Sequence, residues 1–349
     1  MKILHVISSL EVGGAQKLVS DLLPMFSSRG LEVELLVFQD VENNLSKKIK
    51  EAGINIKSLN ETNYSFNLIK KLRREISKYD IVHVHLFPTL YWVAIASIGL
   101  KNTKLVYTEH STSNRRRNKF YFKPIERFIY SFYSRIISIS KQTEQALIEW
   151  LSPRSKTPFV VINNGVDIDL YAQKENIIKN NQIIMVSRFV PAKDQETLIK
   201  AMSYVNKDLS LALVGDGENL ERCKSLSIEL GIDKRVKFLG SCSNVNELLW
   251  QSLIGVQSSH WEGFGLTAVE MMAAGLPVIA SNVEGLKQVV EGAGVLFKQN
   301  DEKELAQEIN KLYKNIEYRN LVIEKCINRS KDYSISKTVQ EITDVYNNL

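Results

Sequence analysis

Two acidic residues in the second half of the chain, Glu262 and Glu270, enclose a glycine loop, Gly263-Phe264-Gly265, and the first turn of a predicted helix. Hydrophobic patterning predicts a strand over residues 254–258 and a helix over 266–274. A glycine loop that opens a helix brings backbone N–H groups close to an anion. Carboxylates accept hydrogen bonds from paired hydroxyls, so the combination favours a nucleotide sugar as ligand. The alternative is a strand-to-helix turn that carries two surface glutamates.

Two cations, Arg188 and Lys193, lie in the sequence SRFVPAK, which follows a predicted strand over residues 183–187. Cations at the carboxyl end of a parallel strand can converge on a diphosphate and stabilise it as a leaving group. In that role they would replace a metal ion. The alternative is an ordinary solvated loop.

In the first half of the chain, two further candidates, Gly13-Gly14 and His110, each follow the carboxyl end of a predicted strand. Gly13-Gly14 lies between the first predicted strand and its helix, where adjacent glycines permit close approach of a phosphate. The pair lacks the third glycine of GxGxxG, which disfavours a dinucleotide cofactor, and a tight turn is the alternative. His110 follows a predicted strand over residues 105–108 and is either a ligand-binding residue, a general acid or base, or a capped loop histidine.

Metal-binding patterns are weak in this sequence. His83 and His85 lie on one face of a predicted strand, but no third ligand is evident, so buried structural histidines are favoured. Asp167 and Asp169 form a DxD pattern at a predicted domain junction, and we treat that match as accidental. The three cysteines are scattered without a CxxC, which favours a reducing compartment and argues against structural zinc.

The composition is that of a globular protein. At 349 residues, with 44% hydrophobic and 24% charged residues, the chain suits two domains. Its apolar runs are too short or too interrupted for a membrane span. The N-terminal MKILHVISSL is similar to a short signal core, yet it suits a buried first strand better. The sequence therefore predicts a cytoplasmic protein.

The net charge of +6 is unevenly distributed, because basic residues are in excess up to residue 167 and acidic residues are in excess after it. The stretch from Arg115 to Arg135 is strongly basic and interleaved with aromatic residues. On a helix this composition suits an anionic bilayer surface, and a core helix with a solvated basic face is the alternative. No nucleic-acid-binding motif is present, so no nucleic acid partner is expected.

Short apolar runs alternate with helical patterns along the chain, then break at a polar linker near residues 176–181 and restart. The alternation predicts an α/β protein with two doubly wound parallel sheets. We assign residues 1–167 to a first domain and 168–334 to a second. The last predicted helix, within residues 335–349, is expected to pack back on the first domain.

Taken together, these residues resemble the GT-B glycosyltransferases of family 4, which are retaining enzymes that use nucleotide sugars. The resemblance covers nearly the whole chain, and its most specific part is the EX7E motif from Glu262 to Glu270. The supporting motifs, in the family's order, are the early Gly-Gly, NGVD from Asn164, SRFVPAK, LVGDGE from Leu213 and VKFLG from Val236. The implied fold is two Rossmann-like domains that face each other across a cleft.

The resemblance also implies roles in donor binding and catalysis. Arg188 and Lys193 would bind the donor diphosphate, and Glu270 would hold the ribose hydroxyls. Glu262 and the backbone of Gly263, Phe264 and Gly265 would face the donor sugar. The N–H groups of Leu266 and Thr267, and the Gly13-Gly14 turn, would contact phosphate.

His110 matches the family's histidine near the transferred sugar, which adds it to Arg188, Lys193 and Glu262 as a catalytic residue. The aspartate that follows this histidine in many members is replaced by Ser111. The resemblance places that difference on the acceptor side of the site more than on the donor side. No metal or other cofactor is expected.

The resulting hypothesis is a hexosyl- or N-acetylhexosaminyltransferase that moves a sugar from a UDP- or GDP-sugar to a lipid-linked or polysaccharide acceptor in surface glycan biosynthesis. It would work in the cytoplasm, peripherally at the inner face of the membrane. Two other hypotheses stay open: a sugar-nucleotide epimerase of the same architecture, and a non-enzymatic two-lobed sugar-binding protein.

Overall fold

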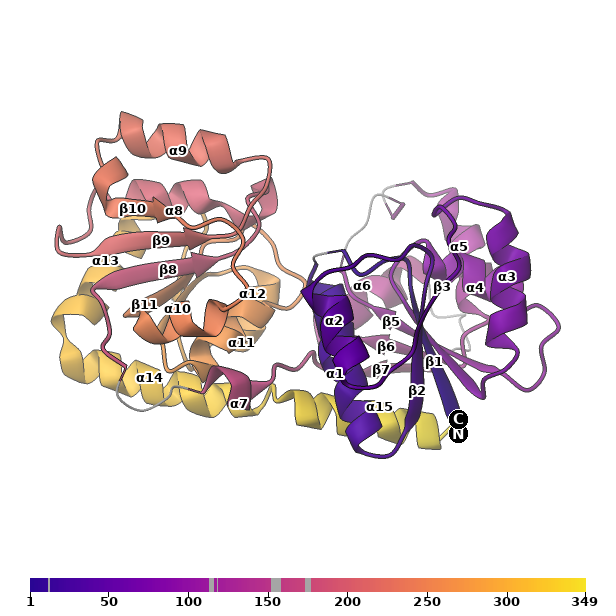
Figure 1. The fold of residues 1–349 in the computed structure, drawn as a ribbon. Coiled ribbons are helices and arrows are strands. Elements are labelled where there is room, and N and C mark those ends of the chain that lie inside the picture. The colour runs from indigo at the N-terminus through magenta and orange to yellow at the C-terminus, as the bar shows by residue number, and fades with distance from the viewer. Residues whose placement is uncertain (12, 113–115, 118, 152–157, 173–176) are drawn as a thin grey trace. The chain divides into compact units, whose positions relative to one another are not determined.

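The computed structural model describes all residues except 12, 113–115, 118, 152–157 and 173–176. The chain divides into two compact units (Figure 1). Unit 1 comprises residues 1–165 and 335–349, and unit 2 comprises residues 166–334. Each is an α/β unit built on one parallel sheet, as the alternating pattern predicts.

The seven-stranded sheet of unit 1 has the order β3-β2-β1-β4-β5-β6-β7. Its strands are β1 (Lys2–Ile7), β2 (Glu32–Val37), β3 (Ile56–Ser58), β4 (Ile81–His85), β5 (Lys104–Glu109), β6 (Arg135–Ser138) and β7 (Phe159–Val161). Strands β1 and β4 are buried almost throughout, because helices cover both faces of a doubly wound sheet.

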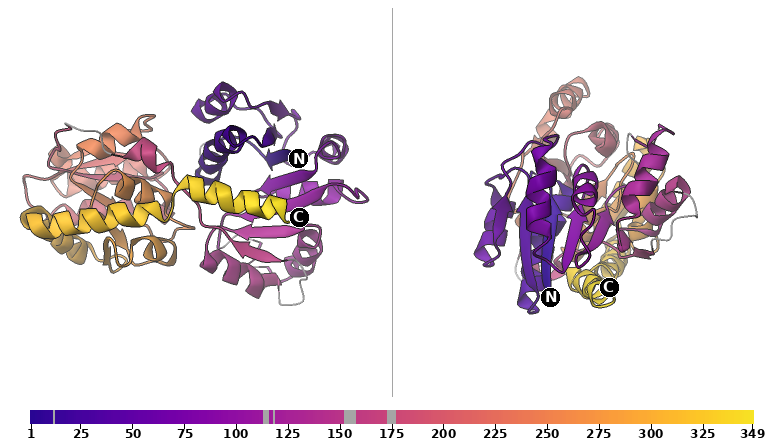
Figure 2. Two further views of the ribbon diagram at one scale, coloured as in Figure 1. Left: turned by 90° about the horizontal axis from the view of Figure 1, so that it is seen from below. Right: turned by 90° about the vertical axis from the view of Figure 1, so that its right-hand side faces the viewer.

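Two helical layers enclose this sheet. One core cluster joins it to α1 (Gly14–Ser28), α2 (Asn44–Glu51) and α15 (Ile335–Asn347). The other joins it to α3 (Asn67–Ile76), α4 (Thr89–Ala96), α5 (Phe122–Tyr130) and α6 (Lys141–Leu151). The final helix therefore packs on the first unit, as predicted, and Figure 2 shows α15 in yellow beside the strands of unit 1.

The six-stranded sheet of unit 2 has the order β10-β9-β8-β11-β12-β13. Its strands are β8 (Gln182–Val186), β9 (Ser210–Val214), β10 (Val236–Phe238), β11 (Ile254–Gln257), β12 (Val278–Ser281) and β13 (Val295–Phe297). Its α-helices are α7 (Ile168–Tyr171), α8 (Gln195–Ala201), α9 (Leu220–Glu229), α10 (Val245–Gln251), α11 (Leu266–Ala273), α12 (Glu284–Val290), α13 (Glu302–Lys314) and α14 (Ile316–Lys331).

Both sheets reverse their strand order at one point, between β1 and β4 in unit 1 and between β8 and β11 in unit 2. Ligands of doubly wound sheets bind at this switch point, outside the carboxyl ends of the strands. Among the described residues, every helix is too short or too polar to cross a lipid bilayer.

Candidate functional site

The switch point of unit 2 brings together the two loops that the sequence singles out. The loop after β8 carries Arg188 and Lys193, and the loop after β11 carries Glu262. The two loops are tied together through the backbone, because the His260 N–H donates to the Ala192 carbonyl over 2.9 Å.

Lys193 and Glu262 form an ion pair inside unit 2, between the lysine Nζ and the glutamate Oε1. Their side chains are mostly buried, with exposed fractions of 19% and 15%. The hydroxyl of Ser259 donates to the same glutamate oxygen over 3.2 Å. The ammonium group is therefore held at the switch point by a carboxylate, and partial burial strengthens the attraction between the two charges.

Two glycines in the loop after β9 allow that loop to pack closely against the backbone of the loop that carries Arg188. Gly215 and Gly217 have φ angles of 133° and 149°, and a Cβ on either would collide with the backbone of Ser187 or Phe189. The Phe189 N–H donates to the Asp216 carbonyl over 2.8 Å, which fixes the loop. Between these anchors the Arg188 side chain is exposed, so its guanidinium remains accessible.

Helix α11 begins at the glycine loop, and Gly265 caps it with a φ of 92°, which suits glycine. A glycine cap has no side chain to satisfy the first N–H groups, which belong to Leu266 and Thr267. Phe264 is buried and packs its ring edge against Tyr333, so only its backbone can serve a ligand. Glu270 is only 5% exposed, which excludes the interpretation that both glutamates lie on the surface.

Unit 2 also contains a cavity of about 500 Å³. Asp194, Lys200, Arg222 and His260 contribute to its lining. None of the residues predicted to bind the donor contributes among the described residues that line it. Residues of the same two loops, Pro191, Asp194 and His260, line the cavity, but the side chains of Lys193 and Glu262 do not.

In unit 1 the predicted residues stand after β1 and β5. Gly13 is the extended N-cap of α1, and Gly14 is the first residue of that helix, with open space where a Cβ would lie. This geometry permits close approach to the Gly14 backbone. His110 follows β5, and its Nε2 lies 3.2 Å from Nδ1 of His85.

The expectation that no third histidine accompanies His83 and His85 is wrong, because His5 on β1 is paired in register with His83. Three imidazoles thus meet in the core of unit 1. Burial lowers the pKa of His5 to about 3 and that of His110 to about 4, and it lowers the pKa values of His83 and His85 well below 6.5. These side chains are therefore neutral at pH 7.

The DxD pattern has a local structural role. Asp167 is the N-cap of the short helix α7, and its Oδ1 accepts a hydrogen bond from the Leu170 N–H over 3.2 Å. An aspartate at this position satisfies a backbone donor at the start of a helix, which accounts for the residue without a metal.

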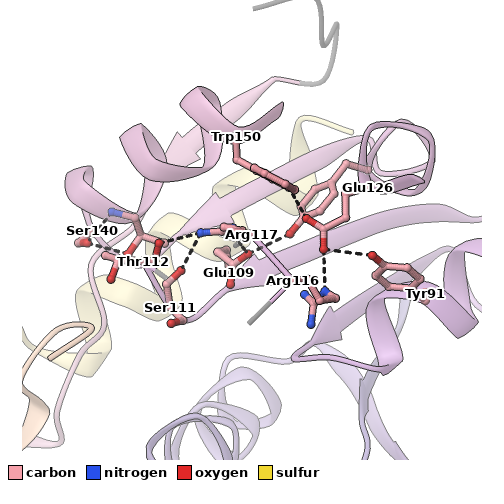
Figure 3. A network of polar contacts seen from close by, with 11 residues as sticks. Tyr91, Glu109, Ser111, Thr112, Arg116, Arg117, Glu126, Ser140 and Trp150 are labelled. Atoms are coloured by element: carbon pink, nitrogen blue, oxygen red, sulfur yellow. Dashed lines mark hydrogen bonds and ion pairs between the residues drawn. The ribbon is translucent and has the colours of Figure 1, made fainter. Parts of the chain in front are cut away.

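The stretch from Arg115 to Arg135, for which the sequence favours either a helix at a bilayer surface or a core helix with a solvated basic face, is only partly helical and only partly solvated. Arg115 lies outside the described residues. Arg116 and Arg117 face inward and form ion pairs of 2.7 Å with Glu126 and Glu109, as Figure 3 shows. Among the described residues of this stretch, the helix covers Phe122–Tyr130, and Arg135 belongs to β6. The sequence shows these cations and Glu126, but not that Glu126 and Glu109 are buried beside two of the cations.

Glu126 is the centre of that buried network and accepts three hydrogen bonds (Figure 3). The donors are Arg116 Nε at 2.7 Å, Tyr91 OH at 3.0 Å and Trp150 Nε1 at 2.5 Å. Replacement of Glu126 by alanine is expected to destabilise unit 1 by about 3–5 kcal/mol, because it removes the buried carboxylate that pairs with Arg116 and accepts from Tyr91 and Trp150. Urea denaturation followed by circular dichroism measures the change.

The matched control is Glu149→Ala, which removes an exposed glutamate from the same unit. A surface change of this kind shifts stability by no more than about 0.5 kcal/mol. If both variants unfold at the same urea concentration as the parent, Glu126 does not hold the network together.

Comparisons with known proteins agree with this architecture. A family model described as "Glycosyl transferases group 1" matches residues 167–329, and one described as "Glycosyltransferase Family 4" matches residues 12–170. A UDP-Gal:alpha-D-GlcNAc-diphosphoundecaprenol alpha-1,3-galactosyltransferase of Escherichia coli is 28% identical over 320 residues, which are 84% of this chain and 81% of the relative. The O-antigen biosynthesis glycosyltransferase WbnH, also of Escherichia coli, is 24% identical over 91% of this chain and 92% of its own.

Among solved structures, Anabaena Alr3699/HepE in complex with UDP-glucose is similar along the entire length of both chains. The TM-score is 0.88 and the sequence identity is 25%. The two family models together span nearly the whole chain, and their boundary near residues 167–170 lies close to the division between the two units. The chain is therefore a glycosyltransferase of family 4 with the GT-B fold.

Proposed function

We propose that this glycosyltransferase is a retaining enzyme that moves a sugar from a UDP- or GDP-sugar to a lipid-linked or polysaccharide acceptor in surface glycan biosynthesis. The observation that carries the proposal is the pairing of Lys193 with Glu262 at the switch point of unit 2, beside the uncapped start of α11. The site combines cations and free N–H groups for a diphosphate with carboxylates for hydroxyls.

In this proposal unit 2 binds the donor and unit 1 receives the acceptor. Arg188 and Lys193 bind the diphosphate, together with the N–H groups of Leu266 and Thr267. Glu270 holds the ribose hydroxyls, and Glu262 with the backbone of residues 263–265 faces the donor sugar. In unit 1, the Gly13-Gly14 turn contacts phosphate and His110 contacts the transferred sugar.

The chemistry follows from the charges. As the glycosidic bond to the nucleotide breaks, negative charge builds on the departing diphosphate and positive charge on the sugar ring. Arg188 and Lys193 stabilise the departing phosphate, so the reaction is proposed to need no metal ion. Retention of the anomeric configuration is proposed to follow from attack on the face that the nucleotide leaves, and no protein nucleophile is assigned.

Two similar proteins support UDP as the nucleotide. HepE has been crystallised with UDP-glucose and with UDP, and the Escherichia coli relative is named for a UDP-Gal donor. Incubation with UDP-sugars and a diphospholipid-linked sugar, followed by NMR of the product, tests the proposal. Transfer with an unchanged anomeric configuration supports it. An epimerised sugar formed without acceptor favours the epimerase, and tight binding of free sugar without nucleotide favours the sugar-binding protein.

A lipid-linked acceptor is supported by the surface around α5. Tyr121, Ile125 and Phe128 lie at helical spacing and are all exposed, at 52%, 47% and 57%, and Phe120 beside them is 85% exposed. Exposed Lys119 and Arg127 lie in the same segment. Apolar side chains flanked by cations suit the interface of an anionic membrane, and we propose that this face docks there, on the cytoplasmic side.

The protein is expected to bind vesicles that contain phosphatidylglycerol, and Phe128→Ser should weaken that binding about tenfold, because burial of a phenylalanine contributes about 1.5–3 kcal/mol. Cosedimentation with vesicles measures the partition. Ile228→Ser in unit 2 is the matched control, since Ile228 is 67% exposed and lies away from the basic segment in sequence. Equal loss in both variants, or no binding by the parent, would count against membrane docking.

A further inference from the structure

Four of the five histidines of the chain meet in the core of unit 1, where one continuous series of hydrogen bonds joins them. From His110 the series passes to His85 over 3.2 Å and from His85 Nε2 to His5 Nδ1 over 3.1 Å. It then passes to Tyr346 over 3.3 Å and to His83 Nδ1 over 2.5 Å. It ends with His83 Nε2 and the hydroxyl of Thr108, 2.7 Å apart.

The protons in this series must all point the same way. A neutral imidazole has one N–H and one bare nitrogen, so each histidine donates on one side and accepts on the other. The Tyr346 hydroxyl has one proton and two lone pairs. Its partners among the described residues are His5 and His83, so acceptance from both would leave its own buried proton without an acceptor. It therefore donates to one histidine and accepts from the other. His5, His83 and His85 are almost completely buried, which keeps them neutral at pH 7. Only two arrangements remain, one for each direction.

Thr108 decides between the two directions. It is only 4% exposed, and within the described residues its hydroxyl has a single hydrogen-bond partner, Nε2 of His83. If Thr108 donates, its proton is satisfied. If it accepts, a buried hydroxyl proton is left with no acceptor, at a cost of about 1–3 kcal/mol. The protons therefore run from Thr108 towards His110.

Followed along the series, this direction assigns every tautomer. Thr108 donates to His83 Nε2, His83 Nδ1–H to Tyr346, Tyr346 to His5 Nε2, His5 Nδ1–H to His85 Nε2, and His85 Nδ1–H to His110 Nε2. His110 is left with its proton on Nδ1. That nitrogen has no partner among the described residues and belongs to a partly exposed side chain.

We propose that Thr108, His83, Tyr346, His5 and His85 are positioning residues that hold His110 in its Nδ1–H tautomer, so that it presents a hydrogen-bond donor to the sugar and not a base. The part that concerns the sugar rests on the proposed function; the tautomer assignment does not. The proposal also assigns a role to helix α15, because the hydroxyl of Tyr346 on that helix links His83 on β4 to His5 on β1.

A metal ion is the competing explanation for three clustered histidines. Nitrogens of His5, His83 and His85 lie within 4.8 Å of one another. All six ring nitrogens of these residues, however, already have a hydrogen-bond partner. A metal would have to displace several of those bonds, and the hydrogen-bonded series needs no metal to be complete.

Solution NMR of protein labelled with ¹⁵N only in histidine tests the assignment, because protonated and bare ring nitrogens differ widely in ¹⁵N shift. His260, the one histidine of unit 2, is identified by comparison with His260→Gln. The other four are expected to show a protonated Nδ1 and a bare Nε2. A protonated Nε2 on His110, an imidazolium among the four, or displacement of their N–H signals by one equivalent of added zinc would overturn the proposal.

Tyr346→Phe removes the hydroxyl that links His83 to His5, and is expected to release the segment from His5 to His110 into a mixture of both tautomers. Tyr133→Phe is the matched control, because it removes another buried hydroxyl of unit 1, bonded to the Leu90 carbonyl over 2.6 Å. In sugar transfer, Tyr346→Phe should lower kcat in proportion to the lost Nδ1–H population and leave the donor KM unchanged. An unchanged His110 tautomer in this variant would contradict the proposal.

The NMR experiment tests the tautomers and the sugar-transfer assay tests the proposed function, so the two can fail independently. If the protein transfers no sugar at all, the proposed function fails while the wild-type spectrum still decides the tautomers. If transfer occurs but the four histidines do not share the Nδ1–H form, only the inference about positioning fails. A variant that does not fold leaves the wild-type spectrum as the deciding measurement.

Discussion

Replacement of Lys193 by alanine is expected to lower the rate of sugar transfer by about 10²–10³-fold, the loss typical of removing one group that stabilises transition-state charge. The Lys193 ammonium is held by Glu262 at the switch point of unit 2, where the donor diphosphate is proposed to bind. Without it, Arg188 and the start of α11 face the leaving group alone. The variant also leaves Glu262 without its cation, which adds repulsion against a phosphate.

Single-turnover kinetics with saturating donor separates this loss from weaker binding. Lys325→Ala removes an exposed lysine from α14 of the same unit and is expected to transfer sugar at the parent rate. The thermal midpoint of each variant shows whether it is folded. A folded Lys193→Ala protein with more than a tenth of the parent rate would remove Lys193 from the catalytic residues.

Acidification is expected to unfold unit 1 selectively. Burial holds the pKa of His5 near 3 and those of His83 and His85 well below the usual 6.5, so only the unfolded chain gains protons as the pH falls below 6.5. Stability is therefore fully present above about pH 6.5 and is lost towards the folded pKa values. Three such groups remove about 4 kcal/mol per pH unit, and a domain is stable by only about 5–15 kcal/mol.

Hydrogen exchange followed by mass spectrometry between pH 7.5 and 5 resolves the two units. Amides of β1 and β4 should lose protection near pH 5, after correction for the intrinsic pH dependence of exchange. Unit 2 serves as the internal reference, because these three histidines all belong to unit 1. Unchanged stability of β1 and β4 at pH 5 would mean that the histidines are already charged, or that other groups offset their cost.

The sequence predicts those features of the molecule that depend on local hydrophobic patterning, namely its strands, its helices and the loops that follow buried strands. Alternating apolar runs predict both parallel sheets, and the last helix, predicted to pack on the first domain, does pack on unit 1. The loops of Arg188 and Glu262 were recognised because each follows a buried strand. That they lie side by side depends on β8 being the neighbour of β11, which is a property of strand order and not of either segment.

Contacts that depend on strand order, and not on local sequence, are the ones that the sequence did not predict. His5 and His83 are far apart in the chain and meet only because β1 pairs with β4. Tyr346 joins them from the last helix, and nothing near it in sequence marks it as a hydrogen-bond partner. The ion pairs of Arg116 with Glu126 and of Arg117 with Glu109 were also not predicted, since charge counts say nothing about which side chains face inward.

The most direct test of the central claim is nucleotide-sugar binding by unit 2, measured as thermal stabilisation by UDP, GDP, ADP and UDP-sugars. A ligand at about 100 times its dissociation constant stabilises the folded protein by about 2.7 kcal/mol. We predict this effect for UDP and UDP-sugars with the parent protein and with Lys325→Ala, and its loss in Glu270→Ala. Absence of stabilisation by every nucleotide, or full stabilisation of Glu270→Ala, would contradict the assignment of the donor site to these loops.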